Sequence, residues 1–502
     1  MRDVVLRKPV LPITSTSAPL SANENESGRL RPRHSQIDSE RLTIERSAEP
    51  NCRKQNLVET YIASYNGGVK TSASTIECRP PVDSLDARVV FLTHYIPLYQ
   101  VRVLQEISRS LQQFRVLLST PIEPNRDFRL DWSGLDVEVQ KAVTIRRRWR
   151  HRNAGFDDPL YVHVPYDTLG KLKSLRPDVV ISHELGARSL AAARYCRRSG
   201  AKLVLATFMS EHTEQGRGWL RQRIRKHLIA RADAITYNGP SCRNYLLSLG
   251  ACEEQLFHLP YAADDRNFSD VAVVRDEPSV RRRLLCIGQL SERKGVLPMI
   301  EQLSEFCERT QQSLEVTLVG DGPLRPGVEE IAARHAEAGQ DSPEARLQIH
   351  VLGNQPASEL PSLMSEHGAV IAPTLADEWL LVVNEAMHAG LPVIGSVYAQ
   401  AVVTMVRDDE NGWQYDPLRR SESSVEGDVA ASLQSVLSRY LELDDYEVEA
   451  MRANAVTTAS AYTPSRSARG ALRAIRSVLG MSDRVEPGDC VESGDRVELG
   501  DA

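Results

Sequence analysis

The sequence has no apolar segment long enough to cross a membrane. No run of about 18 consecutive apolar residues, the length that a transmembrane helix needs, occurs anywhere in it. The segment that begins at Met1 also lacks the apolar core of a secretory signal peptide. We therefore expect a protein that neither spans a membrane nor is secreted by such a signal.

The cysteines lack the spacing of a metal site. The sequence contains no CxxC pair and no Cys/His cluster at zinc-ligand spacing. This pattern predicts a reducing compartment, so we expect a cytoplasmic protein. The formal net charge of -6 is small for 502 residues. Composition therefore gives no reason to expect a general attraction to nucleic acid or to membranes.

Both ends of the chain differ in composition from the middle. Residues 1–85 are rich in Ser, Arg, Glu, Asn and Pro and poor in aromatic residues, which predicts a disordered extension. Residues 481–502 include RVEPGD, CVESGD and RVELGD, three copies of a six-residue unit. Three copies are too few to build the core of a solenoid. We interpret this end as an acidic, solvated tail.

Between these ends, apolar runs of strand length alternate with longer segments of helical period, which predicts an α/β fold. A polar stretch at 264–282 divides the runs into two sets. We expect two domains, at 86–270 and 278–465, with a boundary near residue 275. The runs that fit buried parallel strands are 89–92, 179–181, 203–205, 284–287, 316–319, 349–352, 370–372 and 392–394.

The segment CIGQLSERKGVLPMI has the features of an anion site. A predicted strand ends at Gly288, a polar loop presents Arg293 and Lys294, and a helix is expected to begin near Gly295. Free backbone amides and the helix dipole both favour phosphate at such a helix N-terminus. A solvated basic turn explains this segment equally well when it is considered alone.

The segment VTLVGDGPLR carries a second signal. It runs from a predicted buried strand into Gly320 and Gly322. Small residues at the carboxyl end of a strand allow a ligand to approach the backbone closely. A tight turn is the more common explanation for such glycines.

The third segment, PTLADEWLLVVNEAMHAGLPVIGS, is predicted to hold a helix that begins at Asp377 and Glu378 and ends before Gly390. Along a helix, the eight residues from Asp377 to Glu385 span about 12 Å. A glycoside hydrolase needs its two carboxylates about 5 to 9.5 Å apart, so this pair does not fit that chemistry. The spacing suits two contacts with one long ligand. The alternative is an acid at a helix N-terminus and a solvated glutamate.

In their order and spacing, the three segments resemble the family 4 glycosyltransferases, whose sequences contain GRL-x-x-x-KG, VGDGP and E-P-W-G-L-V-V-N-E-A-M-x-x-G-L-P-V-I. The resemblance implies an α/β protein of the GT-B type, with two Rossmann-like domains facing across a cleft. Residues 283–417 would then hold a nucleotide diphosphate sugar. It also implies no cofactor, no metal, and a helix at 466–480 that crosses back onto the first domain.

The resemblance also assigns roles to individual residues. It implies that Lys294 neutralises the donor diphosphate, that Glu385 binds the nucleotide ribose, and that Asp377 contacts the donor sugar. These three are the predicted catalytic residues of the donor side. Backbone amides around Trp379 to Leu381 would hold the leaving phosphate. The predicted donor-binding set is Gly288, Gln289, Arg293, Lys294, Gly320, Gly322, Trp379, Leu380, Leu381 and Glu385.

Three residues depart from the family pattern. Gln289 stands where the family has a phosphate-binding Arg, and Asp377 shortens the first acid by one methylene. Leu380 replaces a Gly that lets the backbone approach the donor. Arg293 lies in the same loop as Gln289 and is expected to make up the lost charge. These departures leave open a protein that binds sugar nucleotides without catalysis, and a sugar-nucleotide epimerase or a phosphorylase is a third alternative.

The amino-terminal half resembles the family more weakly and is expected to bind the acceptor. Several polar residues follow predicted strands, and any of them could orient an acceptor hydroxyl or assist its proton loss. His183 and Glu211 are the preferred catalytic residues, although a purely structural role stays open for each. The full set is His94, His183, Glu184, Glu211 and His212.

Two basic stretches, 145–152 and 217–231, stand out in this half. In the second, Leu220, Ile224 and Leu228 recur every four residues. Packing of this apolar face on a core is the favoured interpretation, and attraction to anionic lipid is the alternative. No nucleic-acid-binding module is recognisable, so we expect no nucleic-acid partner.

The resemblance to the family 4 glycosyltransferases thus implies a retaining, metal-independent glycosyltransferase. It would move a hexose from a nucleotide diphosphate sugar to a saccharide or lipid-linked acceptor, in the synthesis of surface polysaccharide or glycoconjugate. We expect it in the cytoplasm, and peripheral contact with the inner face of the membrane stays open as the alternative.

Overall fold

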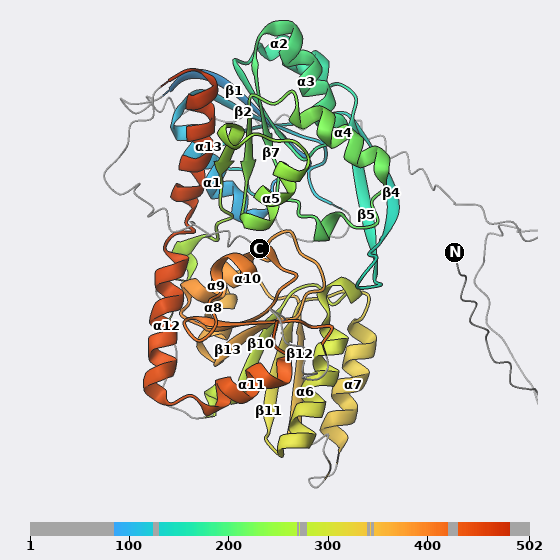
Figure 1. Ribbon diagram of the computed structural model, residues 1–502, viewed down its shortest axis with the longest axis vertical. Helices are drawn as coiled ribbons and strands as arrows, with labels where there is room; N and C mark the ends of the chain where they lie inside the picture. Colours follow the sequence, from blue (N-terminus) through green and yellow to red (C-terminus); the bar gives the residue numbers. More distant parts are fainter. Residues whose placement is uncertain are drawn as a thin grey trace, which may run out of the picture. The chain divides into compact units, whose positions relative to one another are not determined.

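The computed structural model describes residues 85–123, 130–268, 271, 279–338, 342, 346–419 and 430–481. Two parallel β-sheets dominate this part of the chain (Figure 1). The structure describes Leu85 and Met481. The rest of the predicted extension at 1–85 and of the predicted tail at 481–502 lies outside the described residues. The predicted domain boundary near residue 275 lies outside them as well.

The first sheet has seven strands in the order β3-β2-β1-β6-β7-β8-β9, and all neighbours are parallel. The strands are β1 (Leu85–Thr93), β2 (Leu111–Leu118), β3 (Asp136–Val139), β6 (Val179–His183), β7 (Lys202–Ala206), β8 (Ala234–Tyr237) and β9 (Leu256–His258). Between β3 and β6 the chain forms a separate antiparallel ribbon of two strands. They are β4 (Ala142–Arg150) and β5 (Asp157–Pro165).

Helices cover both faces of the first sheet, because successive side chains of a strand point to opposite faces. Val89 and Phe91 of β1 belong to a core shared with α1, whereas Val90 and Leu92 belong to a core shared with α2 to α5. The helices are α1 (Leu98–Arg109), α2 (Thr168–Leu175), α3 (Ala187–Ser199), α4 (Trp219–Ile229) and α5 (Pro240–Ser248), with the short 3-10 turns η1 (His212–Glu214), η2 (Glu253–Gln255) and η3 (Asp265–Asn267).

The second sheet has six parallel strands in the order β12-β11-β10-β13-β14-β15. The strands are β10 (Arg283–Ile287), β11 (Leu314–Val319), β12 (Leu347–Gly353), β13 (Ala369–Ala372), β14 (Val393–Ser396) and β15 (Gly412–Tyr415). The helices around it are α6 (Val296–Thr310), α7 (Arg325–Glu337), α8 (Leu360–Ser365), α9 (Val382–His388), α10 (Gln400–Met405), α11 (Leu433–Glu442) and α12 (Asp445–Ala459), with the turns η4 (Val280–Arg282) and η5 (Glu292–Lys294).

Both sheets follow one topological plan. If the ribbon is set aside, the second and third strands of each sheet lie in order on one side of its first strand. All later strands of the sheet lie in order on the other side. The order therefore reverses between β1 and β6 and between β10 and β13. Ligands of such sheets bind outside the carboxyl ends of the strands at this switch point. The predicted fold of two Rossmann-like α/β units is confirmed, and all eight predicted strands are present.

The last helix, α13 (Pro464–Val478), packs on the first sheet although it follows the second in sequence. Figure 1 shows it, in red, alongside α1, and the two helices are in contact. Its buried apolar side chains, which share a core with β1 and α1, are Ala468, Ala471, Leu472, Ala474 and Ile475. Close packing requires Gly470, because a Cβ there would lie 2.3 Å from the carbonyl oxygen of His258.

Helix α4 differs from the expected amphipathic pattern. Leu228 is fully buried, but Leu220 is 58% exposed, so the four-residue stripe does not pack along its whole length. Arg225 is 1% exposed and lies on the packed face instead. Among the described residues no helix is long and apolar enough to span a membrane. The five described cysteines, at positions 196, 242, 252, 286 and 307, are free thiols.

The tight contact at Gly470 gives a stability prediction. Gly470→Ala should lower the free energy of unfolding by about 1–3 kcal/mol, because the new methyl group forces α13 away from the backbone at His258. Urea denaturation would measure the change. Gly327→Ala is the matched control, since this helical glycine of α7 has open space around its Cβ position. Equal stability of the two variants would contradict close packing of α13.

Candidate active site

A pocket of about 270 Å³ lies at the switch point of the second sheet. It is lined by residues from the ends of β10 and β13 and from the loop that leads into α6. Of the predicted donor-binding residues, Gly288, Gln289, Lys294 and Leu380 line this pocket. The structure therefore brings together residues that lie up to 92 positions apart in the sequence.

The carboxylate of Asp377 joins Arg293 and Lys294, the two cations of the loop between β10 and α6, which we call the donor loop. Lys294 Nζ donates a hydrogen bond to Asp377 Oδ2, and Arg293 Nη1 lies 3.3 Å from the same oxygen. Burial by itself would raise the pKa of Asp377, but Lys294 and Arg293 outweigh it and bring the pKa to about 2. Asp377 is therefore ionised at neutral pH, and it partly neutralises Lys294 before any donor binds.

Arg293 is held from three sides. Besides Asp377, it donates to the carbonyl oxygen of Ala376 at 3.1 Å and to Asp158 Oδ2 at 2.8 Å. Asp158 belongs to β5, so the ribbon of the first half reaches the donor loop of the second. Sequence analysis missed Asp158, because no local pattern marks a partner 135 residues away. These contacts engage Arg293 with protein groups beside the predicted phosphate site.

The predicted start of the helix at Asp377 is wrong. Helix α9 begins at Val382, with Leu381 as its N-cap, so Asp377 and Glu378 lie in the preceding loop. The 12 Å spacing, which assumed a continuous helix, therefore does not apply. The reason is Leu380, whose φ of 83° is left-handed and cannot be part of a right-handed helix. A glycine takes this conformation readily, and the family has Gly at this position.

Glu385 lies on α9 with its pKa raised to about 7. Burial is the cause of this shift, because a desolvated carboxylate is less stable than the neutral acid. Glu385 and Lys294 thus differ in whether an oppositely charged side chain lies beside them. Lys294 has an anionic neighbour in Asp377, and Glu385 has no ion pair among the described residues.

The glycines of the VGDGP segment have a structural explanation. A Cβ at Gly320, where φ is 139°, would lie 2.0 Å from the carbonyl oxygen of Gly288. A Cβ at Gly322 would lie 2.4 Å from the carbonyl oxygen of Leu290. The loops that follow β10 and β11 therefore pack backbone against backbone, which positions Gly288 and Gln289 in the pocket. The donor contacts expected of Gly320 and Gly322 stay predictions.

A polar cluster lies at the switch point of the first sheet. His94 Nδ1 is 3.6 Å from Glu184 Oε1, and the rings of His94 and His183 are 5.4 Å apart. Arg188 donates to Glu184 at 3.3 Å. Burial alone would raise the pKa of Glu184, but the charges of His94 and Arg188 outweigh it, so the pKa lies below its ordinary value. The structure thus joins three of the five predicted acceptor-side residues.

His183 is almost fully buried in this cluster. Its Nδ1 lies 3.0 Å from Thr93 Oγ1, while its Nε2 is buried with no hydrogen-bond partner among the described residues. Burial, followed by the charge of His94, lowers its pKa to about 3. The imidazole is therefore neutral at physiological pH, and one of its ring nitrogens makes no hydrogen bond within the described part of the chain.

Glu211 and His212 lie apart from that cluster. His212 Nε2 is 2.9 Å from the carbonyl oxygen of Leu375, and its ring stacks on Tyr398. This side chain links the loop after β7 to the second half of the chain. Glu211 is exposed, and no contact within the described part of the chain joins its side chain to His183. A catalytic role for Glu211 stays a prediction without a geometric partner.

A second pocket, of about 600 Å³, lies in the first domain beside the polar cluster of His94, His183 and Glu184. Its lining is largely apolar and includes side chains from β1, α1 and α13. Phe91 and Phe208 line it, and both rings lie against His183, with centroid distances of 6.4 and 4.7 Å.

Family models match both halves of the chain. The model described as "Glycosyl transferases group 1" matches residues 281–433, and the model described as "Glycosyl transferase 4-like domain" matches residues 100–262. Together they cover more than half of the 502 residues. The chain belongs to the group 1 glycosyltransferases. The family that the motifs resembled is thereby confirmed.

Solved structures share the fold of this glycosyltransferase. HepE from Anabaena, in a complex with UDP, is 17% identical with a TM-score of 0.55, and the match covers 78% of this chain and 100% of that one. Sucrose-phosphate synthase from Thermosynechococcus elongatus is 15% identical with a TM-score of 0.56, covering 79% and 100%. The catalytic domain of starch synthase IV from Arabidopsis thaliana, bound to ADP and acarbose, is 12% identical with a TM-score of 0.52, covering 79% and 100%. At these identities the similarity shows the fold. No curated protein matches the sequence.

Metal binding was not expected for the glycosyltransferase. Within the described ranges, no group of three His, Cys, Asp or Glu side chains is placed to hold a metal ion. Metal independence stays a prediction.

The backbone of Leu380 gives a prediction that separates strain from packing. A left-handed φ costs an L-residue about 1–2 kcal/mol, and this cost persists in Leu380→Ala but disappears in Leu380→Gly. We expect the glycine variant to be about 1 kcal/mol more stable than the alanine variant in urea denaturation. At an ordinary position glycine is the less stable of the two. That ordinary order, if measured here, would contradict the strained backbone.

The raised pKa of Glu385 gives a pH prediction. The carboxyl has an ordinary pKa of 4.5 when unfolded and about 7 when folded. Between these values the folded glycosyltransferase binds more protons, so this group makes stability fall as pH rises through the window. Glu385→Gln should therefore gain stability relative to wild type as pH rises, measured by thermal unfolding. Glu330→Gln, on the exposed face of α7, should show no such trend. A Glu385→Gln difference that is constant with pH would refute the shift.

Proposed function

We propose that this glycosyltransferase moves a hexose from a nucleotide diphosphate sugar to a saccharide or lipid-linked acceptor, with retention and without a metal. The observation that carries the proposal is the pocket at the switch point of β10 and β13, which holds Lys294 beside Gly288 and Gln289. HepE, which shares the fold, forms complexes with UDP and with UDP-glucose, and this supports a donor of the same class.

The charges around Asp377 support a specific order of events at the donor. A bound diphosphate would compete with Asp377 for Lys294, because both are anions next to the same ammonium group. Asp377 would then depend on Arg293, which lies 3.3 Å away and is anchored by Asp158. In this proposal Arg293 does not replace the missing phosphate-binding Arg at position 289. It keeps Asp377 ionised and in place when Lys294 turns to the phosphate.

Leaving-group stabilisation is the chemical task of this site. Cleavage of the sugar–phosphate bond builds negative charge on the nucleoside diphosphate. Lys294 and the backbone amides at the start of α6, a helix of 15 residues, would stabilise that charge. An acceptor hydroxyl would attack the anomeric carbon from the same face, which retains the configuration, and its proton would pass to a phosphate oxygen of the departing nucleoside diphosphate. His183, neutral and with Nε2 free of protein partners in the described structure, would orient the acceptor hydroxyl.

A second function has one observation in its favour. The side chain of Leu380 lines the donor pocket, at a position where the family has Gly. An isobutyl group there takes up volume next to Lys294, which supports a protein that binds sugar nucleotides without transferring the sugar. The left-handed backbone of Leu380 supports the transferase, because the chain keeps the loop geometry that the family's glycine allows. Contact with anionic lipid and a role in surface polysaccharide stay predictions.

A screen of UDP-, GDP- and ADP-sugars tests the proposal. With a suitable acceptor extract, one donor should release nucleoside diphosphate, and Lys294→Ala should lower the rate by about 100- to 1000-fold because it removes transition-state charge stabilisation. Glu385→Ala should also lose activity, through donor affinity. Both variants should keep the wild-type circular dichroism spectrum.

The transferase and the non-catalytic binding protein predict different outcomes of this screen. A donor that binds in calorimetry but is never turned over would favour the binding protein over the transferase. Full activity of Lys294→Ala would refute the site. Lys171→Ala serves as the control for the loss of one lysine charge, since Lys171 pairs with Glu138 in the first domain.

A further inference from the structure

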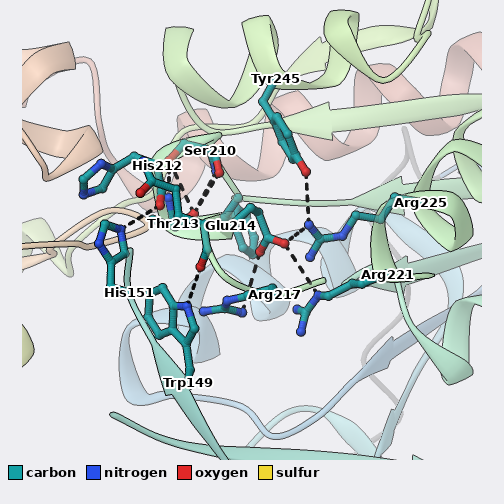
Figure 2. Close-up of polar contacts among 12 residues, drawn as sticks. Trp149, His151, Ser210, His212, Thr213, Glu214, Arg217, Arg221, Arg225 and Tyr245 are labelled. Carbon is teal, nitrogen blue, oxygen red and sulfur yellow. Dashed lines mark hydrogen bonds and ion pairs between the residues drawn. The ribbon is translucent and has the colours of Figure 1, made fainter. Parts of the chain in front are cut away.

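A second group of cations lies in the first domain, outside the donor pocket. Arg217, Arg221 and Arg225 converge on the single carboxylate of Glu214, as Figure 2 shows. Arg225 donates a hydrogen bond to Glu214 Oε2. Arg217 and Arg221 lie 3.6 Å from its oxygens, beyond hydrogen-bond distance. Three guanidinium groups thus face one carboxylate at short range, and the carboxylates of Glu184 and Glu378 act on Arg217 from outside this cluster.

Several polar atoms of this cluster also lack a hydrogen-bond partner among the described residues. Within the described part of the chain, the guanidinium groups of Arg217 and Arg221 make no hydrogen bond to protein. The Nε atoms of Arg217 and Arg225 and Glu214 Oε1 are buried without a partner there. Arg225 is itself 1% exposed. Buried donors of this kind normally have partners, so their absence points to a ligand.

Packing holds these arginines in place before any ligand binds. The Arg217 guanidinium lies over the Trp149 ring, 4.1 Å from its centroid, and Trp149 Nε1 donates to the carbonyl oxygen of Gln215 at 2.7 Å. Arg225 is fixed by Tyr245 Oη at 3.3 Å. Arg221 keeps 37% of its side chain exposed, so it is the cation that a ligand reaches most directly.

The cluster lies within electrostatic range of residues on both the acceptor side and the donor side. The charges of Glu184 and Arg293 both act on Arg217, as does the charge of Glu378 from the loop before α9. Burial, and then the nearby charge of Arg221, lowers the pKa of Arg217 to about 10. Arg217 is still charged at neutral pH, and a bound anion would relieve the repulsion between Arg217 and Arg221.

We propose that Arg217 and Arg221 bind an anionic group, a phosphate or a carboxylate, carried by the acceptor. This assignment rests on the proposed transferase function, and it names the class of acceptor that the function leaves open. A planar guanidinium presents paired donors that match the oxygens of either group. The donor diphosphate is not this ligand, because the pocket that holds Lys294 is lined by other residues, from β10, β13 and their loops.

Calorimetry with inorganic phosphate tests the anion site in the full chain. Lys294→Ala serves as the background, because it weakens phosphate binding in the donor pocket. We expect phosphate still to bind this variant, and the added substitution Arg221→Gln to weaken that binding about tenfold or more. Arg221 is partly exposed, so its loss should leave the fold intact, which thermal unfolding would verify. The control is Arg223→Gln, since Arg223 is an exposed arginine of the same helix with no contact to Glu214.

Each outcome decides the proposal. Phosphate binding that survives Lys294→Ala, falls with Arg221→Gln and is kept with Arg223→Gln supports the site. Loss of all binding in Lys294→Ala, or equal effects of the two arginine substitutions, overturns it. Repeating the titration with glucuronate distinguishes a carboxylate from a phosphate as the preferred group. These titrations need no turnover. A failed donor screen refutes the transferase function, and with it the acceptor as the source of the anion, whereas a failed titration refutes the anion site alone.

Discussion

The ion pairs of Asp377 with Lys294 and Arg293 are the interaction on which the donor site depends. They join the loop after β10 to the loop after β13, the two strand ends at the switch point of the second sheet. Through Asp158, Arg293 extends the same network to the ribbon of the first domain. Removing one partner of such a partly buried pair leaves an uncompensated charge, which is destabilising. The loops, the ribbon and the pocket are therefore coupled electrostatically.

Around that network, backbone segments pack closely against one another, and one residue takes a strained conformation. The glycines after β11 let two loops pack backbone against backbone, and Leu380 takes a conformation that suits glycine better. Both features bring main-chain groups near the pocket. Strain at a ligand site persists only when the surrounding structure holds it in place, and here Trp379 and Val382, on either side of Leu380, are buried in one core. The first domain has a different design, in which cations and histidines gather around single carboxylates.

Several fully buried strands were predictable and the half-exposed ones were not. Strands such as β6 and β13 are buried along their whole length, and each contains a run of consecutive apolar residues. Strands β3 and β9 are only four and three residues long and lie at the edges of the first sheet, and β4 contains RRRWR. Half-exposed strands carry polar residues, so no run marks them. The helix start at Asp377 was wrong because no sequence rule assigns a left-handed φ to leucine.

The α/β class, the family and the order of the donor motifs could be predicted, because these depend on local runs and on spacing along the chain. Which charges meet depends instead on how distant segments pack together. Arg225 is buried although it lies outside the predicted apolar stripe of its helix, and Asp158 reaches Arg293 across 135 residues. His94 and His183 converge because β1 and β6 are neighbours in the sheet. Such contacts follow from strand order and from packing between elements, which no local pattern encodes.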